Sequence, residues 1–341
     1  MKRVVALLDQ FQRPLRDLRI SVTDRCNFRC TYCMPLDEYE WIHKSQVLTF
    51  EEITRLAGIF AGLGVRKIRL TGGEPLLRKD LPRLVEALAG IDSITDVCMT
   101  TNASRLVEMA KPLADAGLGR VTVSLDSLRP ERFRAITQRA ELQPVLDGLQ
   151  TAKEAGLGPV KLNAVIERGV NDDEIVDLLE FARSNELELR YIEFMDVGNA
   201  NQWHSSKLVP KAEILRTIAA VYDFDPVSEP RGSAPSTDYE ISGGGRFGVI
   251  ASVTEPFCGD CSRARLTADG KFVTCLFAGD GRDLKVPIRA GASDVELRSA
   301  IENVWRARTD RYSEQRLVEL QSAKGYQPQR QQKIEMISLG G

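Results

Sequence analysis

The chain has 341 residues, enough for about two domains of roughly 150 residues each and for a sizeable hydrophobic core. Its 46 Lys and Arg residues are balanced by 48 Asp and Glu residues to a net charge of −2, which argues against a nucleic-acid-binding protein because such proteins present positive surfaces to phosphate. The longest wholly apolar run, residues 56–65, is about half as long as a membrane-spanning helix, and the N-terminus does not resemble a signal peptide, so we expect a cytoplasmic protein without membrane contact.

From residue 18 to about residue 220, short runs rich in β-branched residues alternate with segments of helical periodicity. The helical segments tend to end at glycines, including Gly90, Gly117 and Gly156. This alternation predicts parallel βα units, whose ligands gather at the carboxyl ends of the strands. Periodicity leaves open whether the sheet curves into a barrel or stays open and doubly wound. The expected strands are residues 19–23, 67–71, 96–101, 120–126, 160–166 and 188–194.

After about residue 222 the sequence changes character. Prolines such as Pro226 and Pro235 and the glycine run at residues 243–245 interrupt helices, and short strand-like segments such as residues 247–253 appear. We therefore expect two domains, residues 1–222 and residues 223–341, of which the second is smaller and of the α+β class.

Seven cysteines, an odd number in a chain expected to be cytoplasmic, indicate thiols or metal ligands rather than a disulfide framework. Cys26, Cys30 and Cys33 form a C-x3-C-x2-C triplet in a polar loop after the first strand, where three thiolates can converge. Three soft ligands suit an iron–sulfur cluster or zinc; the alternatives are three unrelated buried cysteines or a zinc site completed by a distant fourth ligand. The spacing favours a 4Fe-4S cluster that keeps one iron open for an external ligand.

A second triplet, C-x2-C-x13-C, lies in the expected second domain at Cys258, Cys261 and Cys275. A structural zinc ribbon that lacks its fourth ligand is the alternative to a second iron–sulfur cluster. Arg263 and Arg265 alternate directly after Cys261, so on a strand both guanidinium groups face the same way and suit the forked binding of phosphate oxygens. A solvated pair of surface arginines is the other interpretation.

Three stretches of the sequence resemble known motifs. Residues 21–33, SVTDRCNFRCTYC, are similar to the cysteine signature of the radical S-adenosylmethionine (SAM) enzymes. Residues 71–75, TGGEP, resemble the glycine-rich SAM motif of that superfamily, whose glycines would let the backbone approach the methionyl amine. Residues 257–266, FCGDCSRARL, resemble the C-terminal cluster motif of the GTP 3′,8-cyclases of molybdenum cofactor biosynthesis, and the similarity covers most of the chain. Ala103 and Ser262 depart from that family's usual glycine and asparagine without removing a ligand.

The resemblance implies an α/β fold, a partial (β/α)6 radical SAM barrel with a smaller C-terminal α+β domain that carries a second cluster. It implies two 4Fe-4S clusters, the first of which binds SAM at its open iron while the second anchors the guanine of GTP. By the same resemblance, SAM would contact Tyr32, Gly73, Ser124 and Met195. GTP would be held by Arg19, Arg69, Thr100, Lys161, Arg263, Ala264 and Arg265.

The reaction implied by the resemblance is the conversion of GTP to (8S)-3′,8-cyclo-7,8-dihydro-GTP, the first step of molybdenum cofactor biosynthesis. Reductive cleavage of SAM would give methionine and a 5′-deoxyadenosyl radical, which takes the hydrogen atom from the ribose 3′ carbon before that carbon attacks carbon 8 of the guanine. The implied partners are an unidentified electron donor, the next enzyme of the pathway and, in a homodimer, a second copy of the chain. Gly340 and Gly341 could enter the site or form a frayed terminus.

Two other functions remain as alternatives. A radical SAM enzyme with one auxiliary cluster could act on another substrate such as a peptide, but additional C-terminal cysteines, which favour such an enzyme, are absent from this sequence. A cysteine-rich metal-binding module without catalytic activity is the second alternative, and it would leave the polar residues at the strand ends without a role.

Overall fold

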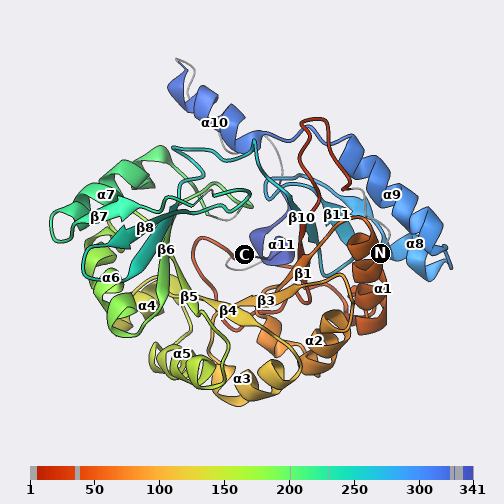
Figure 1. The fold of residues 1–341 in the computed structure, drawn as a ribbon, viewed down its shortest axis with the longest axis horizontal. Coiled ribbons are helices and arrows are strands. Elements are labelled where there is room, and N and C mark those ends of the chain that lie inside the picture. Colours follow the sequence, from red (N-terminus) through yellow and green to blue (C-terminus); the bar gives the residue numbers. More distant parts are fainter. Residues whose placement is uncertain are drawn as a thin grey trace.

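The computed structural model of the protein describes residues 6–34, 39–199, 201–229, 231–322, 326 and 333–340. The strands of this part of the chain form one 12-stranded sheet with the order β12-β11-β10-β1-β2-β3-β4-β5-β6-β9-β8-β7. The sheet curves into an incomplete barrel whose outer side is covered by helices (Figure 1). Within the described residues no strand pairing joins β12 to β7, so the barrel stays open between these two strands.

The centre of the sheet consists of parallel strands that follow one another in sequence order, as the alternation of strands and helices predicts. Every expected strand is present, and no boundary differs from the prediction by more than two residues. The parallel pairing confirms the α/β class, and the curvature of the sheet identifies the partial barrel rather than a doubly wound sheet. These strands are β1 (Asp17–Ser21), β2 (Lys67–Thr71), β3 (Asp96–Thr101), β4 (Arg120–Ser124), β5 (Lys161–Ile166) and β6 (Glu188–Glu193).

Helices connect the parallel strands and cover the outside of the sheet. Helix α1 begins with a capping box, in which the side chains of Thr49 and Glu52 each accept a hydrogen bond from the other residue's backbone amide. The connecting helices are α1 (Phe50–Gly62), α2 (Leu81–Ala89), α3 (Leu106–Asp115), α4 (Pro130–Thr137), α5 (Gln143–Glu154) and α6 (Ile175–Ser184). Short 3-10 helices lie at η1 (Lys44–Gln46), η2 (Pro75–Leu77) and η3 (Asp172–Glu174).

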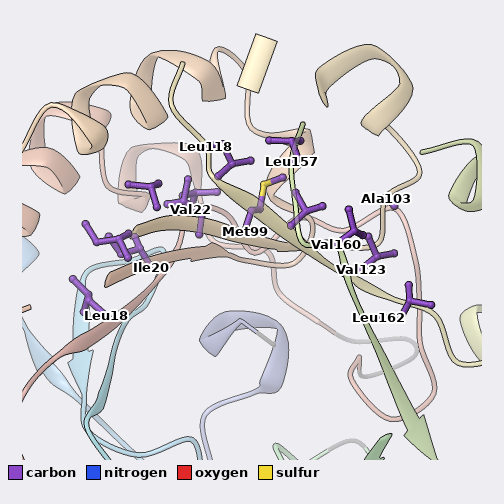
Figure 2. Packing of buried hydrophobic residues seen from close by; sticks show 14 of the residues in the cluster. Leu18, Ile20, Val22, Met99, Ala103, Leu118, Val123, Leu157, Val160 and Leu162 are labelled. Carbon is purple, nitrogen blue, oxygen red and sulfur yellow. The ribbon is translucent and has the colours of Figure 1, made fainter. Parts of the chain in front are cut away.

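The main hydrophobic core lies between the sheet and these helices (Figure 2). Leu18, Ile20, Met99 and Leu162 come from three strands and are fully buried there. Each such side chain contributes about 1.5–3 kcal/mol on burial. Because alternate residues of a strand face opposite sides of the sheet, Arg19, between Leu18 and Ile20, faces the inside of the barrel. The alternation along the strand therefore places polar residues such as Arg19 on the inner face of the barrel.

Residues after 222 extend the sheet at both of its edges. At one edge β10 (Arg263–Leu266) pairs in parallel with β1, and β11 (Lys271–Val273) and β12 (Arg282–Asp283) follow in antiparallel order. At the other edge β9 (Arg246–Ile250) pairs in parallel with β6, and β8 (Thr237–Ile241) and β7 (Phe224–Pro226) continue the sheet. The expected boundary between residues 222 and 223 falls directly before β7, and the division into two folding domains stays a prediction.

Of the remaining helices, α7 (Lys211–Ala219), α8 (Lys285–Arg289) and α9 (Asp294–Arg306) lie on the outer side of the barrel, α10 (Tyr312–Gln321) projects from its rim, and one lies inside it (Figure 1). Helix α11 (Met336–Leu339) sits within the curve of the sheet, close to the C-terminal end of the chain (Figure 1). A further short 3-10 helix is η4 (Ser205–Lys207). In the described ranges, no helix has the length and apolar composition needed to cross a membrane.

Candidate active site

A cavity of about 290 Å³ extends through the inside of the barrel, from the carboxyl ends of the parallel strands to the amino ends of β1 and β10, and both cysteine triplets line it. The triplets lie at opposite ends of two neighbouring strands: the first follows the carboxyl end of β1, whereas Cys258 and Cys261 precede the amino end of β10, which pairs in parallel with β1. Three predicted site residues, Arg69, Lys161 and Ala264, do not line the cavity. The predicted residues that line it are Cys26, Cys30, Cys33, Cys258, Cys261, Cys275, Tyr32, Gly73, Ser124, Met195, Arg19, Thr100, Arg263 and Arg265.

The N-terminal triplet lies in the loop that follows β1. The amides of Cys33 and Met34 both donate to the carbonyl oxygen of Cys30, at 3.0 and 3.1 Å, and close a turn. Burial raises the pKa of Cys26 to about 11 and that of Cys33 to about 12, and the nearby Cys26 thiolate adds to the effect on Cys33. Three free thiols that lie close enough to interact electrostatically are a suitable donor set for a 4Fe-4S cluster, because iron displaces the thiol protons. The residues present therefore fit the cluster that their motif implies.

Gly72 and Gly73 pack closely against this cysteine loop. The amide of Gly73 donates to the carbonyl oxygen of Thr23 at 2.7 Å, and a Cβ atom on Gly73 would overlap the carbonyl oxygen of Arg25. The sequence pattern suggests that these glycines allow a close approach of SAM. The structure adds a different reason, which is that only glycine leaves room for the loop that carries the cysteines.

Replacement of Gly73 by alanine is expected to lower the free energy of unfolding by about 1–3 kcal/mol, because the added methyl group meets backbone that cannot move aside. The control is Gly58→Ala on α1, where an added Cβ atom has no neighbour within 4 Å and alanine favours the helix. Urea-induced unfolding of the two variants without cofactors measures the difference. Equal stability of both variants would show that the loop accommodates the methyl group.

Tyr32 is oriented by the carboxylate of Asp126, which follows β4. Its hydroxyl donates to Oδ2 of Asp126 at 2.6 Å, while Oδ1 of Asp126 accepts from the amide of Val165 at 2.8 Å. Burial raises the pKa of Asp126 to about 6. Ser124, at the end of β4, and Met195, shortly after β6, line the same cavity, so all the residues predicted to contact SAM border one space.

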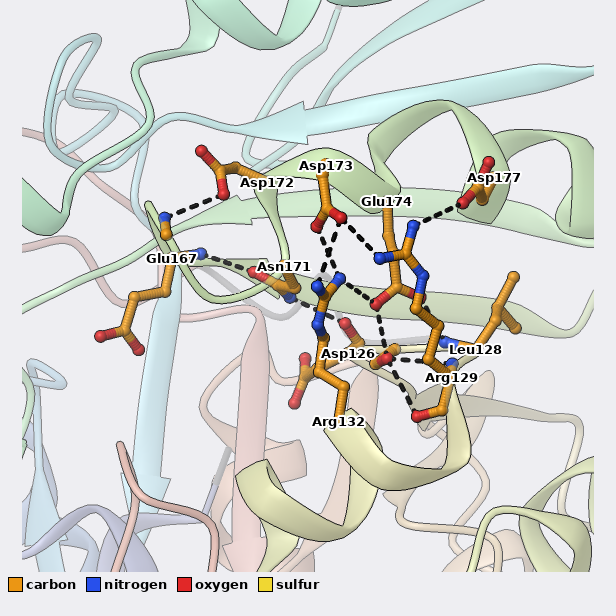
Figure 3. A network of polar contacts seen from close by, with 12 residues as sticks. Asp126, Leu128, Arg129, Arg132, Glu167, Asn171, Asp172, Asp173, Glu174 and Asp177 are labelled. Atoms are coloured by element: carbon orange, nitrogen blue, oxygen red, sulfur yellow. Dashed lines mark hydrogen bonds and ion pairs between the residues drawn. The ribbon is translucent and has the colours of Figure 1, made fainter.

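A polar network fixes the loop that carries Asp126 (Figure 3). The side chain of Glu174 is fully buried and accepts a hydrogen bond from the amide of Leu128 at 2.7 Å. Asn171 donates its side-chain amide to the carbonyl oxygens of Asp126 at 2.7 Å and Val165 at 2.8 Å. The network joins the end of β4 to the connection between β5 and α6, so contacts outside the cavity hold the partner of Tyr32 in place.

The C-terminal triplet lies on both sides of the β10–β11 hairpin. The amide of Cys261 donates to the carbonyl oxygen of Cys258 at 3.3 Å and forms a turn. Burial opposes the ionisation of Cys261, but the positive charges of Arg263 and Arg308 outweigh this effect and lower the pKa of Cys261 to about 7. Burial raises the pKa of Cys275 to about 12. Three free thiols again suit an iron–sulfur cluster. Among the described residues no three His, Cys, Asp or Glu side chains are arranged to hold a single metal ion, and the assignment of both triplets to clusters stays a prediction.

Arginine side chains concentrate positive charge on the wall between the triplets. Arg19 on β1 lies opposite Arg265 in the ladder with β10. Burial, followed by the charges of Arg265 and Arg69, lowers the pKa of Arg19, and burial together with Arg263 lowers that of Arg265 to about 10. Like charges at this depth are costly unless an anion meets them. The wall is therefore suited to a polyanionic ligand.

The three predicted GTP contacts outside the cavity lining interact with other protein groups. Arg69 donates to the hydroxyl of Thr100 at 3.2 Å, and Thr100 itself lines the cavity. Lys161 forms an ion pair with Glu188, its neighbour in the β5–β6 register. Ala264 is fully buried in the hydrophobic core, on the face of β10 opposite to Arg263 and Arg265. Their contacts with GTP stay predictions.

The C-terminal segment reaches into the cavity. Met336 lines it, and Arg265 donates to the carbonyl oxygens of Leu339, at 3.1 Å, and Gly340. Gly341 lies outside the described residues. Up to Gly340, the segment therefore enters the site rather than ending in solvent.

Asp196, the neighbour of Met195, binds this segment to the barrel. Its carboxylate forms ion pairs with Arg316 and, at 2.6 Å, with Lys333, and it accepts a hydrogen bond from the hydroxyl of Tyr312 at 2.6 Å. Burial opposes the charge of Asp196, but Arg316 and Lys333 outweigh it and lower the pKa to about 2. One buried carboxylate thus gathers four side chains from the last 30 residues of the chain, those of Tyr312, Arg316, Tyr326 and Lys333.

Replacement of Asp196 by asparagine is expected to destabilise the C-terminal segment by about 3–5 kcal/mol, because two buried cations lose their counter-charge. Hydrogen exchange of the amides in residues 333–340 should become faster. The control is Asp173→Asn, which removes a half-exposed carboxylate that pairs with surface arginines and should cost at most about 1 kcal/mol. Unchanged exchange in the Asp196 variant would assign the anchoring to the buried apolar residues of α11 instead.

Sequence reasoning did not assign a role to Glu74, Asp126 and Arg308, which line the cavity, or to Asp196 beside Met195. Glu74 belongs to the recognised glycine-rich motif, and Asp126 and Asp196 follow the ends of strands, so the motif and the position of ligands at strand ends could have indicated them. Arg308 follows α9 without any surrounding motif, and only the fold brings it to Cys261.

Comparisons with known proteins agree with the sequence motifs. The sequence model of the Radical SAM superfamily matches residues 20–182, and the model described as Molybdenum Cofactor Synthesis C matches residues 187–314. The chain is 51% identical over 322 residues to a GTP 3′,8-cyclase of Acidothermus cellulolyticus, covering 91% of this chain and 89% of that protein. It is 44% identical over 346 residues to the GTP 3′,8-cyclase of Staphylococcus aureus strain MRSA252, covering 99% and 100% of the two chains.

Solved structures with the same fold share little sequence with the chain. Streptococcus suis SuiB bound to S-adenosylmethionine superposes with a TM-score of 0.57 at 16% identity, over 77% of this chain and 60% of that chain. SuiB bound to the precursor peptide SuiA superposes with a TM-score of 0.61 at 14% identity, over 89% of this chain and 67% of that chain. These similarities support the fold alone.

Proposed function

Because this chain belongs to the GTP 3′,8-cyclase family of radical SAM enzymes, we propose that it converts GTP to (8S)-3′,8-cyclo-7,8-dihydro-GTP, the first step of molybdenum cofactor biosynthesis. The observation that carries the proposal is the sharing of one cavity by two cysteine triplets and the arginines Arg19, Arg263 and Arg265. A radical SAM enzyme that modifies a peptide does not require a group of arginines beside its clusters. A metal-binding module without catalytic activity does not require a cavity that both triplets line.

Cys26, Cys30 and Cys33 would hold the 4Fe-4S cluster that the family implies, with SAM beside Tyr32, Gly73, Ser124 and Met195. When bound, the cluster and SAM supply the one-electron chemistry that removes a hydrogen atom from the ribose. The chain contributes orientation, because Asp126 fixes the hydroxyl of Tyr32 and the close packing of Gly73 fixes the cysteine loop. Cys258, Cys261 and Cys275 would hold a second 4Fe-4S cluster, and the open iron of that cluster would anchor the guanine.

The arginine group would bind the triphosphate. Arg19, Arg263 and Arg265 lie close together, and burial and mutual repulsion already lower the pKa values of Arg19 and Arg265. A triphosphate relieves this repulsion and accepts charge-assisted hydrogen bonds from planar guanidinium groups. Arg69 would act on GTP through Thr100, to which it donates. The C-terminal segment, held by Asp196, helps to exclude water from the cavity.

The proposed reaction requires partners outside the chain. An electron donor must deliver reducing equivalents, and the product would pass to the next enzyme of the pathway. A cytoplasmic location and a homodimer stay predictions.

The test is anaerobic reconstitution with iron and sulfide, followed by incubation with SAM, reductant and GTP and by mass analysis of the nucleotide. We expect two 4Fe-4S clusters by iron analysis and Mössbauer spectroscopy, and a cyclised nucleotide that forms only when SAM is present. If SAM is cleaved while GTP stays unchanged, the assignment of GTP as the substrate is refuted. Stoichiometric zinc without iron uptake would favour the metal-binding module.

A further inference from the structure

Arg308 encloses the turn that carries Cys261. Its side chain is 2% exposed and stacks over the ring of Trp305 at 4.5 Å. One guanidinium nitrogen donates to the carbonyl oxygen of Cys261 at 2.8 Å, and another donates to the Cys261 sulfur at 3.4 Å. The remaining N–H group, at Nε, donates to Asp310 at 2.8 Å. The planar fork of one arginine is thus directed at both the backbone and the sulfur of a predicted cluster ligand.

Two more arginines lie around the same turn. Arg263 donates to the Cys261 sulfur at 3.2 Å, so that this sulfur accepts hydrogen bonds from two cations. Arg13, which pairs with Asp9, donates to the carbonyl oxygen of Cys258 at 2.8 Å. Asp9 and Asp310 form ion pairs with Arg13 and Arg308 and partly balance this charge, but both side chains that donate to the Cys261 sulfur are cations.

The N-terminal triplet has a different setting. The guanidinium of Arg29, a residue within the cysteine loop, donates to the carbonyl oxygens of Cys26 and Phe28 rather than to sulfur. The Cys26 sulfur accepts a neutral hydrogen bond from the amide of Phe28 at 3.3 Å. In the part of the chain that the structure describes, no Arg or Lys side chain donates to a sulfur of this triplet.

Net charge and hydrogen bonds to sulfur are among the factors that set the reduction potential of an iron–sulfur cluster, because reduction adds negative charge that a nearby donor stabilises. We propose that Arg308 is a positioning residue for the C-terminal triplet and raises the reduction potential of a cluster bound there. This inference rests on the second cluster of the proposed function. It gives the two triplets different electronic roles, with the more easily reduced cluster on the side of the arginine wall.

The experiment uses full-length protein in which Cys26, Cys30 and Cys33 are all replaced by alanine, so that only the C-terminal triplet takes up a cluster. Redox titrations followed by electron paramagnetic resonance compare this protein with the same protein carrying Arg308→Met or Arg308→Lys. We expect a more negative potential in Arg308→Met, which lacks charge and donors. We expect an intermediate potential in Arg308→Lys, because lysine keeps the charge but lacks the planar fork that directs separate nitrogens at the sulfur and the carbonyl oxygen. The matched control is Arg306→Met, which removes a guanidinium that is 62% exposed and two residues away.

If the reduction potential of Arg308→Met is unchanged, the proposal is overturned. If Arg306→Met shifts the potential as much as Arg308→Met does, the direct contact between Arg308 and the Cys261 turn is not the cause of the shift. If Arg308→Met retains no cluster, the comparison with Arg308→Lys decides, and an unchanged potential there overturns the proposal. If the protein with native Arg308 takes up no iron at the C-terminal triplet, the second cluster itself is refuted, and with it that part of the proposed function.

Discussion

Replacement of Cys30 by alanine is expected to abolish cleavage of SAM, whereas replacement of Cys275 should leave some cleavage to 5′-deoxyadenosine while the cyclised nucleotide disappears. The reason is that Cys30 belongs to the triplet beside Tyr32 and Gly73, where the SAM motifs lie, and Cys275 belongs to the triplet beside the arginine wall. Chromatography of the SAM products and mass analysis of the nucleotide, both after anaerobic reconstitution, measure the two activities separately.

The matched control is Cys98→Ala. Cys98 is a free and fully buried thiol on β3 that lies outside the cavity lining, so both activities should survive its loss. Equal loss of SAM cleavage in the Cys30 and Cys275 variants, with each still folded and holding its other cluster, would contradict the division of labour between the triplets.

Replacement of Arg265 by alanine should weaken the binding of GTP by roughly 10- to 100-fold, because a charge-assisted hydrogen bond to phosphate contributes about 1.5–3 kcal/mol. Arg265 is 6% exposed, so solvent screens its contacts little. Lysine at this position should restore affinity only in part, since it lacks the planar fork. Affinity for SAM should stay unchanged, and guanosine without phosphates should be affected much less. Equilibrium binding to reconstituted protein measures these affinities.

Arg246→Ala serves as the control, because this arginine on β9 is exposed and pairs with Glu240 at the surface. GTP affinity that is unchanged in both Arg263→Ala and Arg265→Ala would remove these residues from the site and would weaken the assignment of GTP as the substrate.

Local sequence patterns were sufficient to predict the strands and helices of the barrel, but not to predict which strands pair with one another. The runs at residues 67–71 and 96–101 coincide with β2 and β3, because β-branched residues and flanking turns are local signals. The pairing of β10 with β1 joins residues that are far apart in sequence, and no periodicity encodes such a partner. The change in composition at residue 222 predicted a second domain. It did not predict that the residues after 222 form the strands at both edges of the sheet.

Motifs identified which residues line the cavity more reliably than which atoms those residues contact. The cysteine triplets and Arg265 line it as expected, whereas Lys161 is paired with Glu188 across the β5–β6 register. That partner depends on how two strands align, which the sequence of either strand alone does not specify. The contact between Arg308 and Cys261 similarly depends on where α9 ends against the sheet.

The parallel pairing of β1 with β10 also has a consequence for the order of events during synthesis. Asp17 and Ser262, which share a hydrogen bond at the start of this ladder, are 245 residues apart. A contact of such long range pays the entropy of closing a large loop, so it forms late in folding and only after most of the chain has left the ribosome. The N-terminal cysteine loop is thus made long before its cavity can close. Until then its three thiols are accessible to iron–sulfur assembly factors and to oxidants alike.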